Sequence, residues 1–122
     1  MIITRIDGGL GNQLFQYAYG LYLATQHQVP LLLDTNSYAD TPAHGYLLDR
    51  LNISARPLTA EQQRLLPRRY RHQPSNWRLG DLFGLGPLRR HKEAPFGFQP
   101  EHLHIADQSY LVGYWQSERF FP

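Results

Sequence analysis

Two short aliphatic runs flank an amphipathic segment near the start of the chain. Residues 1–6 are apolar and partly β-branched, which predicts a buried strand that Asp7 and the following glycines end. Residues 13–26 show helical spacing of apolar positions and predict a helix. Residues 30–33 predict a second strand, which Asp34 ends. Strand, helix and strand in this order predict a parallel βαβ unit with a right-handed crossover.

The predicted helix has one apolar face and an expected cap. That face consists of Leu14, Ala18, Leu21, Tyr22 and Thr25. Asn12 is a favourable residue type for the N-cap. Gly20 inside the helix costs about 1 kcal/mol relative to alanine, unless close packing requires a bare backbone there.

The middle of the chain has weaker periodicity. We expect a loop from residue 34 to 45 and a short strand over residues 46–53. Thr59 and Gln62 fit a capping box that opens a short helix to about Leu66. Residues 67–100 are rich in Arg, Gly and Pro, and we interpret them as an irregular insertion, a lid or a mobile segment.

The last part of the chain predicts the beginning of another strand–helix unit. Residues 110–115 form a third strand candidate, and Ser117 is the expected N-cap of a helix that starts at Glu118. We expect Phe120 and Phe121 to be exposed there. The elements together predict an α/β fold with a Rossmann-like parallel sheet, present as a single partial domain over residues 1–122.

Composition supports a folded domain and excludes several kinds of chemistry. The 122 residues are 42% hydrophobic and 18% charged, which argues against disorder. The absence of cysteine excludes disulfides, thiolate nucleophiles and cysteine-ligated metal sites. Residues 1–7 have no signal-peptide pattern, and the longest aliphatic run, residues 29–33, is too short to span a bilayer. We therefore expect a soluble, cytoplasmic protein.

The net charge of +2 is unevenly distributed along the chain. Eight basic residues crowd the middle third: Arg64, Arg68, Arg69, Arg71, Arg78, Arg89, Arg90 and Lys92. Such a segment can meet phosphates, nucleic acid or the inner face of an anionic membrane, or it can be an ordinary solvated surface. No helix-turn-helix and no aromatic–basic platform is evident, so we expect no nucleic-acid partner.

The glycine-rich turn over residues 8–12 is the best candidate site. A turn between a strand and a helix can direct backbone N–H groups at an anion. Gly9 and Gly11 permit positive φ and close approach of a ligand, and Asn12 and Gln13 add amide donors and acceptors. Position 14 is leucine, so the dinucleotide fingerprint is incomplete, and no Walker A sequence follows. A structural turn and a ligand-binding loop both remain open.

A second candidate site lies at the end of the third predicted strand. Tyr114 and Trp115 can stack on the apolar face of a pyranose, and Gln116 can hydrogen-bond its hydroxyls. The alternative is a core strand followed by a capped helix. His102 and His104 form the closest histidine pair, but no supporting carboxylate pattern accompanies them, so we expect no metal site.

Four stretches of the sequence together resemble a known enzyme family. GGLGNQLFQYA over residues 8–18 closely resembles the opening signature of the α-1,2-fucosyltransferases of glycosyltransferase family 11. PLLLD over residues 30–34, YLLDRLNI over 46–53 and YLVGYWQSE over 110–118 agree with that family in the same order. The Arg-rich middle of the chain shows the least resemblance.

The resemblance implies a GT-B-like enzyme with two Rossmann-like domains, of which this chain would be an incomplete N-terminal one. Such an enzyme transfers L-fucose from GDP-fucose to the 2-hydroxyl of a galactoside with inversion and without a metal. On this basis Gly9, Gly11, Asn12 and Gln13 would line the cleft beside the reacting sugar, with Asn12 facing the catalytic centre. Residues 114–116 would support that cleft.

One departure from the family limits the expected activity. The family's His-x-Arg-Arg-x-Asp motif supplies an arginine that neutralises the departing diphosphate, and no such pattern occurs here. We therefore expect little or no transferase activity from this polypeptide alone. The alternative is a non-catalytic carbohydrate-binding or partner-binding domain derived from that family.

Overall fold

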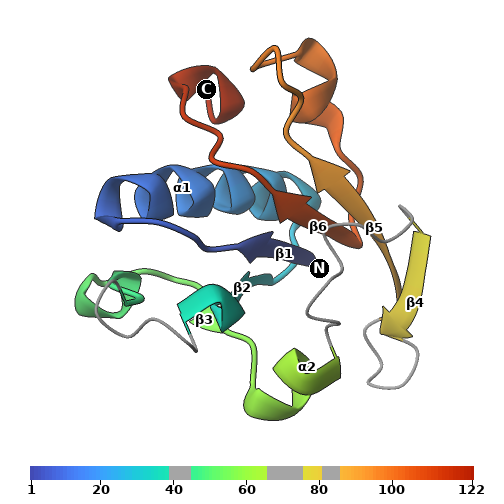
Figure 1. Cartoon of the computed structure of the whole chain (residues 1–122). Helices are drawn as coiled ribbons and strands as arrows, with labels where there is room; N and C mark the ends of the chain where they lie inside the picture. Colours follow the sequence, from blue (N-terminus) through green and yellow to red (C-terminus); the bar gives the residue numbers. More distant parts are fainter. Residues whose placement is uncertain (39–44, 66–75, 81–85) are drawn as a thin grey trace.

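The computed structural model describes residues 1–38, 45–65, 76–80 and 86–122, which contain one sheet with strand order β3-β2-β1-β6-β5-β4 (Figure 1). The strands are β1 (Ile2–Arg5), β2 (Leu31–Asp34), β3 (Arg56–Pro57), β4 (Asn76–Gly80), β5 (Gly86–Lys92) and β6 (Ser109–Val112). The five strands from β3 to β5 are parallel, and β4 pairs antiparallel with β5. The predicted α/β class with a Rossmann-like parallel sheet is therefore confirmed.

Helix α1 (Leu10–His27) connects β1 to β2, and these two strands pair in parallel, as the βαβ prediction requires. A short helix α2 (Ala60–Leu65) follows β3. Two 3₁₀ helices flank the last strand, namely η5 (Pro100–His104) before β6 and η6 (Glu118–Phe120) after it. Figure 1 shows η5 and η6 at the end of the sheet where β5 and β6 finish.

Strand β1 lies at the centre of the sheet and buries a residue on each face. Ile2 belongs to the larger core cluster, beneath α1, and Ile3 belongs to a smaller cluster on the opposite face. The larger cluster contains the aromatic rings of Tyr19, Trp115 and Phe120. The centroid of the Trp115 ring lies 4.5 Å from that of Tyr19 and 5.2 Å from that of Phe120. These contacts attach the residues that follow β6 to α1.

Helix α1 differs from its prediction in its start and its buried face. It begins at Leu10 with Gly9 as N-cap, so Asn12 lies in the first turn and does not cap the helix. Leu14, expected to be buried, is 40% exposed. The buried residues are instead Gln13, Gln16, Tyr19, Gly20, Leu23 and Ala24. The prediction failed because it assigned the glutamines to solvent, whereas both bury their amides in hydrogen bonds.

Two predicted strands do not have the expected form. Residues 48–50 form a 3₁₀ helix, not the strand expected over 46–53, and Leu48 inserts into the core with no exposed surface. Strand β6 ends at Val112, three residues before the predicted end. Trp115 has a φ of 54°, a left-handed conformation that a continuing strand excludes.

The irregular insertion expected over residues 67–100 is wrong for the described part of that segment. Residues 76–80 and 86–92 are strands of the sheet, and η5 begins at Pro100. Residues 67–75 and 81–85 lie outside the described residues. Pairing with β6 sets the conformation of β5, a long-range contact that local periodicity does not report.

Three local predictions are confirmed. The Thr59 N–H donates to Gln62 Oε1 at 2.8 Å and the Gln62 N–H donates to Thr59 Oγ1 at 3.2 Å, which completes the capping box of α2. Ser117 is the N-cap of η6, and its hydroxyl accepts from the Arg119 N–H. Gly20 lies against the sheet, as close packing requires. Phe120, however, is 1% exposed, so its expected exposure is wrong.

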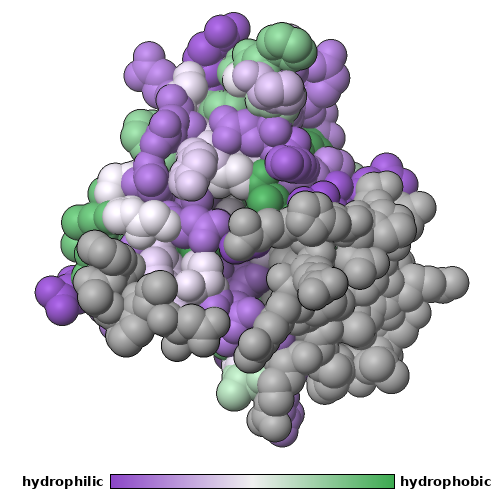
Figure 2. All heavy atoms as spheres, in the orientation of Figure 1, coloured by the Kyte–Doolittle hydropathy of each residue, from purple (hydrophilic) through white to green (hydrophobic). Residues whose placement is uncertain are grey.

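The visible surface of the described residues is chemically mixed. Figure 2 shows hydrophilic side chains interspersed with smaller hydrophobic areas in the orientation of Figure 1. Within the part of the chain that the structure describes, no helix has the length and apolar character that crossing a membrane requires.

Gly20→Ala should destabilise the protein, whereas Gly11→Ala in the same helix should not. A Cβ at Gly20 would lie 2.9 Å from Leu31 Cδ1 and 3.2 Å from Thr4 Cγ2, whereas a Cβ at Gly11 meets no atom within 4 Å. Overpacking at Gly20 outweighs the gain in helix propensity, for a net loss of about 1 kcal/mol. Gly11→Ala should gain about 0.5 kcal/mol. Urea unfolding of both variants measures the difference, and equal effects would contradict this packing.

Candidate functional site

The glycine turn lies where two neighbouring parallel strands end. Residues 7–9 follow β1, and residues 113–116 follow β6, which pairs with β1. Ligands of open α/β sheets bind outside the carboxyl ends of the strands, so this edge is the expected position of a site. The two segments form the candidate site together.

Gly8 is the residue that determines the shape of the turn. Its φ is 75°, and a Cβ there would lie 2.6 Å from Asn12 Nδ2. Gly9 and Gly11 do not use the positive φ that glycine permits, because Gly9 has φ −81° and Gly11 lies in the first turn of α1. Both remain exposed, and a Cβ at either position would meet no atom within 4 Å. Their bare backbone is therefore open to a ligand.

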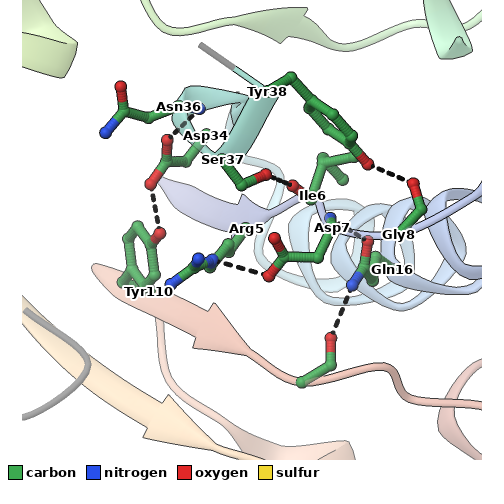
Figure 3. Close-up of polar contacts among 11 residues, drawn as sticks. Arg5, Ile6, Asp7, Gly8, Gln16, Asp34, Asn36, Ser37, Tyr38 and Tyr110 are labelled. Atoms are coloured by element: carbon green, nitrogen blue, oxygen red, sulfur yellow. Dashed lines mark hydrogen bonds and ion pairs between the residues drawn. The ribbon is translucent and has the colours of Figure 1, made fainter. Parts of the chain in front are cut away.

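The buried amide of Gln16 joins the two segments from below (Figure 3). Its Oε1 accepts from the Asp7 N–H at 2.9 Å, and its Nε2 donates to the Gly113 carbonyl at 3.0 Å. Gln16 itself is 1% exposed, whereas its two partners are half-buried. The amide thereby fixes the position of the β1 turn relative to the end of β6.

The Gln13 side chain joins the glycine turn to a third segment, residues 45–47, by hydrogen bonds. Its Nε2 donates to the carbonyls of Gly8 at 3.0 Å and Gly45 at 3.2 Å, and its Oε1 accepts from the Leu47 N–H at 2.9 Å. The side chain has no exposed surface. Gln13 therefore does not line the site directly, contrary to the expectation, but holds the turn in place.

A layer of buried charged and phenolic groups lies beneath the turn (Figure 3). Arg5 is 8% exposed, and its Nε lies 2.7 Å from Asp7 Oδ2. Asp34 accepts from the Asn36 N–H at 2.9 Å and from the Tyr110 hydroxyl. Burial raises the pKa of Asp34, and the Asn36 N–H and the charge of Arg5 only partly oppose that rise.

The outer side of the turn is held by residues that follow β2. The Tyr38 hydroxyl donates to the Gly8 carbonyl at 2.7 Å, and the Ser37 hydroxyl donates to the Ile6 carbonyl at 2.6 Å (Figure 3). Burial and the negative charge of Asp7 raise the pKa of Tyr38 to about 12. Tyr38 is therefore a neutral hydrogen-bond donor at physiological pH.

Two of the expected site residues contact each other. Asn12 Oδ1 accepts a hydrogen bond from Gln116 Nε2, which links the first turn of α1 to the segment after β6. Tyr114, two residues before Gln116, is 49% exposed. Glu93 Oε2 fixes this segment by accepting from the backbone N–H groups of Tyr114 at 2.8 Å and Trp115 at 3.2 Å.

Trp115 does not join them. It has no exposed surface and packs among the core aromatics, so its ring cannot stack on a sugar in this conformation. The positive φ at Trp115 turns the ring inward while Tyr114 and Gln116 remain exposed. For Trp115 the structure therefore agrees with the alternative of a core position and not with direct contact to a sugar.

The rim of the site is polar and largely uncharged. Gly9, Gly11, Asn12, Tyr114 and Gln116 present backbone groups, amides and one phenolic ring, a combination suited to a neutral hydroxylated ligand. Arg5 lies just below this rim but is paired with Asp7. Throughout the residues that the structure describes, no group of three or more His, Asp or Glu side chains is arranged to hold a metal ion.

Sequence reasoning missed the supporting residues of this site. Arg5, Gln16 and Tyr38 act through contacts between elements that are distant in the sequence, and composition does not indicate such contacts. One signal was present for Gln16. It lies three positions from Gln13 and three from Tyr19, so all three share a helical face with the buried Leu23.

Comparison with known proteins relates part of this chain to a glycosyltransferase. Over 54 residues the chain is 43% identical to an alpha-1,2-colitosyltransferase of Escherichia coli. The matched stretch covers 43% of this chain and 19% of that relative. No protein-family model matches the chain, and no solved structure matches it.

Gln16→Leu should destabilise the fold through its unpaired partners. The substitution leaves the Asp7 N–H and the Gly113 carbonyl without the amide, at a cost of about 2 kcal/mol. Gln26→Leu in the same helix is the matched control, because Gln26 is exposed and should change stability by about 0.5 kcal/mol or less. Chemical denaturation of both variants tests this expectation, and an equal response would show that the buried amide is dispensable.

Asp34 should make stability depend on pH with an unusual sign. Its pKa is raised in the folded state, so between the unfolded and folded pKa values the folded protein binds more protons than the unfolded chain. This contribution to stability is present below the ordinary Asp pKa and is lost as the pH rises through the folded pKa. Asp34→Asn should remove that decline, which unfolding curves at a series of pH values will measure.

Proposed function

We propose that this chain forms one wall of the active-site cleft of an α-1,2-fucosyltransferase. The complete enzyme would transfer L-fucose from GDP-fucose to the 2-hydroxyl of a galactoside with inversion and without a metal. We further propose that it works in the cytoplasm, at the inner face of the membrane. The partial match to a glycosyltransferase supports the general reaction class.

The observation that carries the proposal is that residues 8–18 and residues 110–118 are in contact in the structure. Residues 8–18 and 110–118 resemble the fucosyltransferase family most specifically, and they lie at opposite ends of the chain. Two hydrogen bonds join them, Gln16 to Gly113 and Asn12 to Gln116, across 97 and 104 positions of sequence. The residues that carry the resemblance therefore form one surface, as a shared active site requires.

Each exposed residue of that surface has a role in the proposed reaction. The ring of Tyr114 stacks on the apolar face of the galactoside, and the amides of Asn12 and Gln116 bind its hydroxyls. Gly9 and Gly11 allow the reacting sugar to approach the backbone closely. This positioning holds the acceptor hydroxyl in line with the anomeric carbon, which is the main catalytic contribution of such a wall.

The chain by itself should not stabilise the departing diphosphate. A departing diphosphate needs fixed positive charge, and the His-x-Arg-Arg-x-Asp motif that supplies it in the family is absent from the sequence. At the described rim, Arg5 is buried and engaged by Asp7, so it does not replace that charge. We therefore propose acceptor binding without turnover for the isolated chain.

Two alternatives rest on specific observations. The relative transfers colitose according to its name, so a colitose donor is an alternative to fucose. The neutral rim and the missing motif favour a second alternative, a non-catalytic carbohydrate-binding domain. Appearance of α-1,2-linked product when the chain is supplied with GDP-fucose and a galactoside would reject the non-catalytic alternative, and with it the absence of turnover proposed for the isolated chain.

A titration followed by NMR tests the proposed wall. A galactoside such as lactose should shift the backbone signals of Asn12, Tyr114 and Gln116, and GDP-fucose alone should shift them little at millimolar concentration. Tyr114→Ala should weaken galactoside binding about fivefold or more, because the stacking surface is lost.

Tyr22→Ala provides the matched control for that variant. Tyr22 lies in the second half of α1, away from the glycine turn, so its loss should leave galactoside affinity unchanged. If Tyr114→Ala and Tyr22→Ala bind the galactoside equally well, or if glucose and galactoside produce the same shifts, the proposed acceptor site is wrong.

A further inference from the structure

A concavity lies between β5 and η5, apart from the glycine turn. It encloses about 960 Å³ and is lined by residues 88–92 of β5, by residues of η5 and by the segment 105–109 that leads into β6. This volume suits a small-molecule ligand. None of the residues proposed to contact the galactoside lines it.

The register of the sheet determines which side chains of β5 face this pocket. Arg89 pairs with Ser109 and His91 pairs with Leu111. Paired residues of parallel strands direct their side chains to the same face, and Leu111 belongs to the core cluster beneath α1. Arg89 and His91 therefore lie on that face, on the side where η5 covers the sheet.

Two imidazole rings of the pocket wall have ring nitrogens that bear on ligand binding. His91 Nε2 is buried and has no hydrogen-bond partner among the described residues. His102 Nδ1 accepts from the Gln99 N–H at 3.0 Å, which leaves the Nε2 of the neutral ring as an N–H donor. A buried polar atom without a protein partner is uncommon in folded proteins and indicates an unseen water, ion or ligand.

The charges around His91 favour an anion. Burial lowers the pKa of His91, and the charges of Arg89 and His102 lower it further. Arg89 is exposed and forms no ion pair with any other described residue. Of the acids that line the pocket, Asp107 is held by the N-terminal ammonium group, whereas Glu101 faces the pocket from η5.

His102 and His104 of η5 are two further titratable groups that line the pocket. Burial lowers the pKa of His102, and the negative charges of Glu93 and Glu101 partly oppose that shift. His104 lines the mouth from η5 and is exposed.

Arg90 and Lys92 also line the pocket, but they pair with Tyr110 and Val112 and so belong to the other face of β5. On the face of Arg89 and the three histidines, Glu101 is the lining acid that forms no ion pair with another described residue.

We infer that this pocket binds a small ligand through an oxyanion, a phosphate or a carboxylate group, with Arg89 as the charged donor. Arg89 forms the charge-assisted hydrogen bonds, and the imidazole groups of His91 and His102 supply the neutral N–H donors of the wall. The site is independent of the proposed galactoside site because the two share no residues.

Titration with inorganic phosphate tests the inference directly. With ¹³C-labelled histidine and at constant pH, phosphate should shift the ring signals of His91 and His102 and the shift should saturate. Arg89→Gln should weaken this binding about fivefold or more, because the charged donor is removed. Acetate in place of phosphate distinguishes a carboxylate ligand from a phosphate ligand, and saturation by either supports the site.

Arg56→Gln is the matched control, since it removes the same charge from an exposed residue of β3, at the opposite side of the sheet. Its phosphate affinity should equal that of the unsubstituted chain. The inference is overturned if chloride at equal ionic strength produces the same shifts, or if Arg89→Gln and Arg56→Gln respond alike. Tyr114→Ala should leave phosphate binding intact, so failure of the galactoside site and failure of this one remain distinguishable.

Discussion

The two hydrogen bonds of the Gln16 amide are the interaction on which the rest of the site depends. A buried amide must satisfy both its oxygen and its nitrogen, and here the partners belong to segments that are far apart in the sequence. The end of β6 therefore cannot move away from the turn after β1 without leaving polar groups unpaired. Because of this constraint, Gly8, Asn12, Tyr114 and Gln116 have defined relative positions although all of them lie at the surface.

The chemistry changes from charged to neutral between the base of the site and its rim. Arg5, Asp7 and Asp34 lie at the base, where ion pairing and hydrogen bonds stabilise them. The rim presents amides, backbone groups and the Tyr114 ring. Such a surface offers hydrogen bonds and stacking without strong electrostatic attraction. It therefore suits an uncharged polyol better than a nucleotide, whose phosphates require positive charge.

How much of this structure the sequence could predict depends on the range of the interactions. The capping box of Thr59 and Gln62 and the βαβ unit arise from contacts that are local or follow from periodicity, and both were predicted correctly. The strand character of residues 86–92 depends on partners elsewhere in the fold and was missed, whereas the burial of Trp115 agrees with the core alternative that the sequence had left open. The buried face of α1 was missed because Gln13 and Gln16 are polar residues whose burial depends on distant backbone groups.

The central position of β6 affects the order in which the protein is assembled. Strands β1 and β2 have been synthesised once the chain reaches residue 34. The other edge of β1 stays unpaired until residues 109–111, which pair with it, have been synthesised. At ordinary rates of translation this interval lasts on the order of ten seconds, during which the hydrophobic β1 exposes unpaired backbone groups. A nascent chain of this kind is open to wrong pairing throughout that interval. Chaperones that cover strand edges would therefore matter more for its synthesis than for its finished state.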